Sequence, residues 1–197
     1  MDARGQAIAE VARYCDVEER LPLIPASAMT RGMYFRSIDE QLAAAGKAER
    51  FREIFPKRYA ALGWYPTREF LCHLTVGAGE LLDPARVHEG MFELGRRNAR
   101  AFADGVLGKL MLRVLARDPV KILKQGLAAR RQSAKPARWE LEFPDERTAV
   151  MDLIQEYAYI ESYELGAAHG TFEAIDVPVR IECTLQERFV GKHVLRW

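Results

Sequence analysis

The sequence predicts an α+β fold in which an N-terminal helical layer packs on a four-stranded antiparallel sheet. The clearest observation is a period of two near the C-terminus, where Val177, Val179 and Ile181 alternate with polar residues. Such alternation is typical of a strand with one buried face. The second observation is the order of the elements: several helical patterns come first, and from Trp139 they are followed by strand, strand, helix, strand and strand. This segregation is typical of α+β domains.

The composition indicates one soluble domain over residues 1–197. The chain has 197 residues, 49% of them hydrophobic, and no Gly/Ser/Pro-rich linker divides it, so it can bury a full core. Its 29 basic residues nearly balance 28 acidic ones, which gives no general attraction to nucleic acid or anionic membranes. No apolar run approaches the ~20 residues of a membrane span, and the N-terminus lacks a signal-peptide pattern. We therefore expect a cytoplasmic protein.

The N-terminal part is expected to be helical, with an arm over residues 1–30 that docks on the core. Residues 1–20 alternate small apolar and charged side chains, which suits either a short amphipathic helix or a frayed arm. The run from Leu21 to Pro25 is not expected to continue a helix, because proline removes a donor and restricts the residue before it. A helix over residues 37–45 is predicted to end at Gly46, a suitable residue just past a helix C-terminus.

Residues typical of helix N-termini predict where the helices in the middle of the chain begin. Pro66 is expected to open a strongly apolar helix, as proline suits a first helical turn. Asp83-Pro84 and Asp118-Pro119 each combine a capping carboxylate with a first-turn proline, a pattern typical of helix N-termini. Between these two helices, a short and very apolar helix is predicted over residues 106–115.

The stretch from Lys121 to Arg138 is basic. Its cations are Lys121, Lys124, Arg130, Arg131, Lys135 and Arg138. We interpret them as a solvated helix end whose charges complement the helix dipole. A phosphate or acidic-partner patch is the alternative, and it is less favoured because no aromatic residues are interleaved to stack on bases.

Two hairpins and one helix are predicted for the C-terminal part. The predicted elements are strands over residues 139–143 and 148–153, a helix over 157–175, and strands over 177–187 and 190–197. In the third strand, Val179, Ile181, Cys183 and Leu185 should face the helices. A one-residue slip would reverse every one of these side chains, so this register is a sharp expectation.

Small residues in the predicted helix over 157–175 mark a candidate ligand site. Gly166 and Gly170 are one turn apart and share a face, and repeated glycine in a helix indicates that a neighbour comes close. A strand, a helix or a second copy of the chain is favoured as that neighbour. In the ligand alternative, His169 offers one polar contact in an apolar pocket, with Tyr163 and Cys183 as further contacts.

Catalytic and metal-binding motifs are missing from the sequence. There is no Gly-x-Ser-x-Gly elbow, no phosphate loop and no His-Glu-x-x-His, and the three cysteines are too far apart for a metal site. His73 is expected to be a core histidine with one hydrogen bond. Glu161 and Glu164 could serve as acid or base, but a solvated helix face explains them more simply. We therefore expect no catalytic residues, no metal and no cofactor.

Several short segments resemble a known family. They are Arg31-Gly32-Met33-Tyr34-Phe35, Phe55-Pro56-Lys57-Arg58-Tyr59, Tyr65-Pro66, Leu94-Gly95-Arg96, Gly108-Lys109-Leu110-Met111, Asp118-Pro119 and Glu164-Leu165-Gly166-Ala167-Ala168-His169-Gly170. In kind and order they resemble a paralogous family of unknown function, of about this length, that is expanded in myxobacteria. The resemblance covers nearly the whole chain.

The C-terminal order of elements also resembles a wider fold group. The group includes the four-vinyl-reductase-type small-molecule-binding domain, the haem–nitric-oxide-binding domain and the Bet3-type subunits of vesicle-tethering complexes. Several members hold a small or apolar ligand between helices and sheet. This sequence departs from the first pattern, which has clustered cysteines near its end, because only Cys183 stands here. It departs from the second, because the haem-anchoring Tyr-x-Ser-x-Arg motif is not matched. The resemblance therefore carries over neither metal nor haem.

These observations favour a non-enzymatic small-molecule-binding or sensory domain. The alternative is a ligand-free interaction or adaptor domain, as in Bet3-like subunits, and a weaker alternative is an enzyme that uses Glu161 or His169. A small apolar ligand, a homodimer or a protein partner is expected, and nucleic acid is not. A cavity between sheet and helices would favour the first function, an exposed apolar patch the second, and titratable groups converging in a cleft the third.

Replacing Gly166 by leucine separates the packing explanation from the ligand explanation. If another backbone packs there, the variant should unfold at a lower temperature or lose its association with a second copy. If a ligand fills the space, the fold should survive and a co-purified small molecule should disappear from the native mass spectrum. A variant that matches the parent in stability, oligomeric state and bound mass would contradict both explanations.

Overall fold

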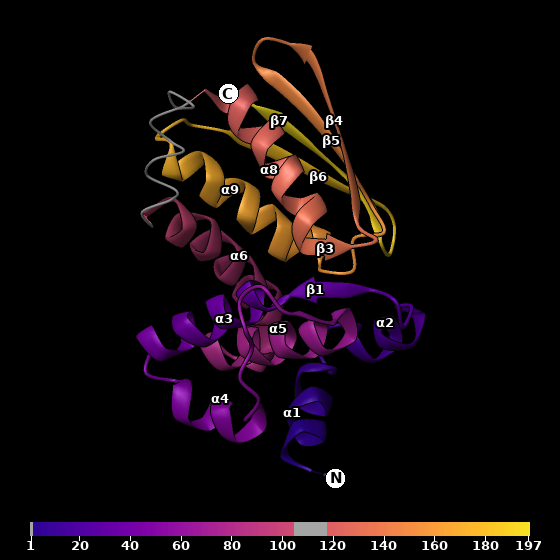
Figure 1. The fold of residues 1–197 in the computed structure, drawn as a ribbon, viewed down its shortest axis with the longest axis vertical. Helices are drawn as coiled ribbons and strands as arrows, with labels where there is room; N and C mark the ends of the chain where they lie inside the picture. Colours follow the sequence, from indigo (N-terminus) through magenta and orange to yellow (C-terminus); the bar gives the residue numbers. More distant parts are fainter. Residues whose placement is uncertain (1, 105–117) are drawn as a thin grey trace. The chain divides into compact units, whose positions relative to one another are not determined.

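A computed structural model describes residues 2–104 and 118–197 of the chain (Figure 1). The predicted α+β class and four-stranded antiparallel sheet are confirmed. The chain divides into two compact units, Met1–Leu94 and Gly95–Trp197, and the single domain over residues 1–197 stays a prediction. The apolar helix predicted over residues 106–115 lies outside the described residues.

The first unit is built from helices around a buried α5. Its elements are α1 (Ala3–Val11), α2 (Val17–Leu23), β1 (Met29–Arg31), α3 (Gly32–Ala44), α4 (Ala48–Ile54), β2 (Trp64–Pro66), α5 (Thr67–Leu81), the 3₁₀ turn η1 (Pro84–Arg86) and the start of α6 (Val87–Asp104). Helices α1, α2 and α3 all contact α5. Almost every residue of α5 is buried, as its apolar sequence predicts.

The N-terminal residues form two helices. Asp2 begins α1, because its carboxylate accepts a hydrogen bond from the Gly5 amide at 2.7 Å. The expectation that the run from Leu21 to Pro25 could not continue a helix is wrong for its first part, since Pro22 lies inside α2. Proline there forgoes only one hydrogen bond, and α2 ends one residue later, at Leu23.

The start and stop signals at Gly46, Asp83 and Asp118 are confirmed, whereas Pro66 ends β2 and α5 begins one residue later, at Thr67. Helix α3 ends shortly before Gly46, which has a φ of +72°, a conformation that favours glycine. The Asp83 carboxylate accepts a hydrogen bond from the Ala85 amide at 2.8 Å. The Asp118 carboxylate accepts one from the Lys121 amide at 3.2 Å. Each of these bonds satisfies an amide that has no partner within its helix.

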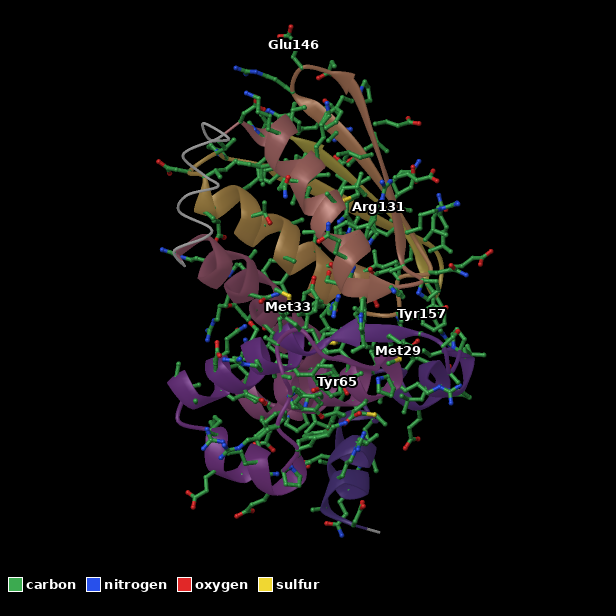
Figure 2. All side chains as sticks on the ribbon, viewed as in Figure 1. Met29, Met33, Tyr65, Arg131, Glu146 and Tyr157 are labelled. Atoms are coloured by element: carbon green, nitrogen blue, oxygen red, sulfur yellow. The ribbon has the colours of Figure 1, made fainter. Side chains whose placement is uncertain are left out.

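The second unit is a sheet packed against helices. Its elements, after the last part of α6, are α8 (Pro119–Ser133), β3 (Ala134–Lys135), β4 (Arg138–Asp145), β5 (Thr148–Ile154), the turn η2 (Ile160–Glu164), α9 (Leu165–Ala174), β6 (Arg180–Glu187) and β7 (Val190–Arg196). The strand order is β4-β5-β7-β6, with every neighbouring pair antiparallel. Figure 2 labels Glu146 at the tip of the β4–β5 hairpin.

The core of the second unit lies between the sheet and the two helices α8 and α9. Leu195 of β7 is fully buried, as is Leu153 of β5. They share one cluster with Ile122 of α8 and Phe172 of α9. Within residues 2–104 and 118–197, no helix combines the length and apolar character needed to cross a membrane.

The predicted register of β6 holds for most of the strand. Val179, Ile181 and Cys183 pack against the core, whereas Leu185 is 42% exposed, so the expectation for Leu185 is wrong. The pairing of β6 with β7 shifts between Leu185 and Glu187. An irregularity of this kind bends a strand and increases its twist, which accounts for the exposure of its end.

Alanine substitution of two leucines tests where the core ends. Leu195→Ala should lower the free energy of unfolding by about 2–5 kcal/mol, because a fully buried leucine leaves a cavity. Leu185→Ala should change it by less than about 0.5 kcal/mol, as is usual at the surface. Urea denaturation of both variants measures the difference, and equal losses would contradict this assignment of the core.

Candidate functional site

A π-helical turn, η2, leads into α9 in the second unit. The Glu164 amide donates to the Tyr159 carbonyl at 3.1 Å, the i to i+5 bond that defines such a turn. π-Turns are rare and are frequently found at functional sites. Most of η2 is buried, namely Ile160, Ser162, Tyr163 and Glu164. The helix predicted from residue 157 therefore begins as a wider turn with inward-facing polar side chains.

The carbonyl of Ile160 anchors η2 to the sheet. His193 on β7 donates from Nε2 to this oxygen at 3.1 Å, and Cys183 Sγ on β6 lies 4.0 Å from it. Burial lowers the pKa of His193 to about 4, so the ring is neutral and its one proton is on Nε2. Burial also raises the pKa of Cys183 to about 11, with a contribution from the Glu161 charge, so Cys183 is a thiol.

Two glycines let α6 approach η2 and α9 closely. A Cβ on Gly95 of α6 would overlap the Tyr163 carbonyl oxygen, and a Cβ on Gly170 of α9 would overlap the Arg96 carbonyl oxygen. Any other residue at these two positions would push the backbones apart. The neighbour at Gly170 is thus a helix of the same chain, in agreement with the packing explanation.

A buried charge cluster lies beside the same turn. It comprises Arg130 of α8, Glu156 between β5 and η2, and Glu164 of η2, with side chains 7%, 2% and 3% exposed. Arg130 Nε donates to Glu156 Oε2 at 3.1 Å, and Arg130 Nη2 contacts Glu156 Oε1. The same Nη2 lies 3.1 Å from Glu164 Oε1. One guanidinium therefore faces two carboxylates.

The two carboxyl groups of the cluster differ in the number of hydrogen bonds that they accept. Glu156 also accepts hydrogen bonds from Trp139 Nε1 at 2.9 Å and from the Ala158 amide at 3.2 Å. Glu164 Oε1 has the ion-pair contact with Arg130 but no hydrogen bond. Burial raises the pKa of Glu164 to about 8; Arg130 opposes this rise and the Glu156 charge adds to it. Glu164 is therefore protonated at neutral pH.

The residues predicted as ligand contacts all lie in the second unit but do not share one surface. Tyr163 and Gly170 face α6, where Asn98 Nδ2 lies 3.4 Å from the Tyr163 hydroxyl. Cys183 instead faces Ile160 from the sheet. Gly166 is buried on α9. The role of these residues in binding stays a prediction.

His169, the remaining predicted contact, is half-buried on α9. Burial lowers the pKa of His169, while the Glu173 charge raises it and the Arg96 charge lowers it. Arg96 and Glu173 are themselves paired at 3.0 Å. His169 therefore borders a surface ion pair.

The charge cluster was not predicted from the sequence. Arg130 was expected to be solvated with the rest of the basic stretch, and this is wrong, whereas Arg131 beside it is exposed (Figure 2). The expected solvated position of Glu164 is wrong as well. One signal was available: Leu123, Leu127 and Arg130 follow one another at helical spacing, which continues the apolar stripe of α8 into Arg130.

The first unit contains a second buried histidine, on α5. His73 is fully buried, and its Nε2 lies 2.9 Å from Asp39 Oδ1. The prediction of a core histidine with one hydrogen bond is thus confirmed. Four aromatic rings surround it at centroid distances of 4.7 to 5.4 Å: Phe35, Phe51, Phe55 and Tyr59.

Comparison with known proteins links the sequence to one family. The model of a family described as "Protein of unknown function (DUF2378)" matches residues 24–186. No curated protein matches the sequence.

Solved structures of H-NOX domains share the fold. The Fe(II) unliganded H-NOX protein from K. algicida has a TM-score of 0.64 at 16% identity, over 84% of this chain and 95% of that one. An H-NOX protein from S. oneidensis in the Fe(II)NO state gives 0.55 at 11% identity, over 84% and 98%. An oxygen-binding H-NOX domain related to soluble guanylate cyclases gives 0.54 at 15% identity, over 84% and 90%. The predicted resemblance to the haem–nitric-oxide-binding group is confirmed at the level of fold.

Haem is named for structures of the H-NOX family, so the histidines of this chain were tested as haem ligands. All four lie in the described residues. His73 and His193 are buried with Nε2 engaged, and packed side chains surround both rings. His88 is exposed and His169 only half-buried. A histidine-ligated haem needs an imidazole that faces an enclosed space for the macrocycle, and these residues do not fit that requirement.

Alanine substitution of two neighbouring arginines tests the cluster. Arg130→Ala should lower the free energy of unfolding by about 3–5 kcal/mol at pH 8, because it leaves a buried carboxylate without its cation. Arg131→Ala should change it by less than about 0.5 kcal/mol, because this side chain is exposed. Chemical denaturation measures both, and equal effects would contradict the cluster.

Proposed function

Because the chain belongs to the DUF2378 family and has the fold of H-NOX domains, we propose that it is a non-enzymatic sensory domain that binds a small molecule other than haem. The observation that carries the proposal is the H-NOX fold across 84% of the chain. Solved members of that fold include an oxygen complex and an Fe(II)NO state. Fold alone does not fix function, so the ligand must be identified directly.

The proposed ligand contacts are those near η2 and α9. Tyr163 and His169 offer polar atoms, and Gly166 leaves the helix surface without a side chain, whereas the space beside Gly170 is filled by the Arg96 carbonyl of α6. Together with Cys183, these are the residues whose substitution should change binding. A cytoplasmic location is part of the proposal.

An enzymatic role is not supported by the buried cluster. Its titratable side chains are at most 7% exposed, so a substrate in solution does not reach them. An adaptor role without ligand is the second candidate. It is favoured by large apolar side chains on the surface of the first unit, where Leu62 is 80%, Leu23 56% and Met33 42% exposed.

Native mass spectrometry of the full chain, expressed with a haem precursor, tests the proposal. We expect a bound small molecule, lost on denaturation, and no haem absorption band. A haem band at one group per chain would overturn the haem-independent assignment. A spectrum with no bound mass, but with a captured protein that Leu62→Ser and Met33→Ser weaken, would overturn the sensory assignment in favour of the adaptor.

A further inference from the structure

The turn η2 is held in place by side chains from several elements. His193 of β7 and Cys183 of β6 contact the Ile160 carbonyl, Asn98 of α6 lies beside the Tyr163 hydroxyl, and Arg130 of α8 faces Glu164. The first three contacts involve uncharged groups. The fourth pairs a cation with a carboxyl whose charge can change.

We propose that Glu164 is a proton-operated latch: with its proton it holds η2 against Arg130 and Glu156, and without its proton it releases η2 and the start of α9. The latch is a property of the fold and does not depend on the proposed ligand.

The charge balance of the buried cluster supports the latch. With Glu164 protonated, the cluster has one cation, Arg130, and one anion, Glu156, which are joined by two contacts. With Glu164 ionised, one cation faces two anions in a site that is at most 7% exposed. Burying an unpaired charge is costly unless water or a counter-ion reaches it. The lowest-cost relief is for the turn that carries Glu164 to open.

Within residues 2–104 and 118–197, the charges that act on Glu164 are those of Arg130 and Glu156. On β7, His193 is neutral, because its pKa is lowered to about 4. On β6, Cys183 is a thiol, because its pKa is raised to about 11. On α6, Arg96 is paired with Glu173 of α9 at 3.0 Å.

The direction of the pH effect follows from linkage. Burial raises the pKa of Glu164 from 4.5 to about 8. Between these values the folded chain holds a proton that the unfolded chain has lost, so this group's contribution to stability falls as pH rises toward 8. A glutamine at position 164 has the shape of the protonated glutamate but cannot ionise. In the folded chain the pKa of His193, about 4, and that of Cys183, about 11, lie outside the window from pH 6.5 to 9.

Hydrogen exchange of the full chain between pH 6.5 and 9 tests the latch. After correction for intrinsic rates, protection of residues 160–175 in the parent should fall with pH, by up to about tenfold per unit, because one proton is coupled to opening. Protection of β5 and β7 should stay constant. Glu164→Gln should keep residues 160–175 protected across the range. Glu173→Gln, which removes a carboxylate 40% exposed on the same helix, should behave like the parent.

Either of two outcomes would overturn the latch. One is a parent protein whose residues 160–175 are equally protected at pH 6.5 and 9. The other is a Glu164→Gln variant that loses protection with pH as the parent does. Should Glu164→Gln fail to fold, the parent profile decides alone. A loss of protection that also includes β5 and β7 reports global unfolding and counts against the latch.

Discussion

The second unit depends on one guanidinium, Arg130, that contacts two buried carboxyl groups, those of Glu156 and Glu164. Arg130 connects α8 to the segment between β5 and η2, through Glu156, and to η2 itself, through Glu164. Trp139 adds β4 to the same network, because its indole donates to Glu156. Removing the cation would leave charge in a site with little access to water, and a buried charge without its partner is among the most destabilising defects in a protein. The packing of helix, turn and sheet is therefore tied to one electrostatic arrangement.

The backbone elements followed from the sequence because their signals are local. Alternation marks β6, and a capping carboxylate followed by proline marks α8, so each element was found from a few neighbouring residues. The cluster is not local, since its members come from three places in the chain that the fold brings together. Arg130 and Arg131 are neighbours of identical chemistry, and the face of α8 on which each lies decides that one is buried and the other exposed. Leu185 was missed for a similar reason, because its exposure follows from a shift in pairing with β7.

The chain has the fold of H-NOX domains, and its two buried histidines are hydrogen-bonded within the protein. Nε2 of His73 is directed to Asp39 and Nε2 of His193 to a backbone carbonyl. Buried polar groups that have found partners contribute to a defined structure. In this chain, hydrogen bonds within the protein at His73 and His193 thus support the fold. Function must then be sought in the residues of this site, since a fold can host many functions.

The two glycine contacts that α6 makes with η2 and α9 have an evolutionary consequence. Gly95 of α6 faces the Tyr163 carbonyl of η2, and Gly170 of α9 faces the Arg96 carbonyl of α6, so neither position tolerates a side chain while the contact is kept. A side chain added at one glycine cannot be accommodated by a substitution at the other, because each clash is with a backbone carbonyl, which every residue type has. In homologues that keep this contact both positions should be invariant. Invariant positions cannot covary, so this close helix contact would be invisible to methods that infer contacts from correlated substitutions.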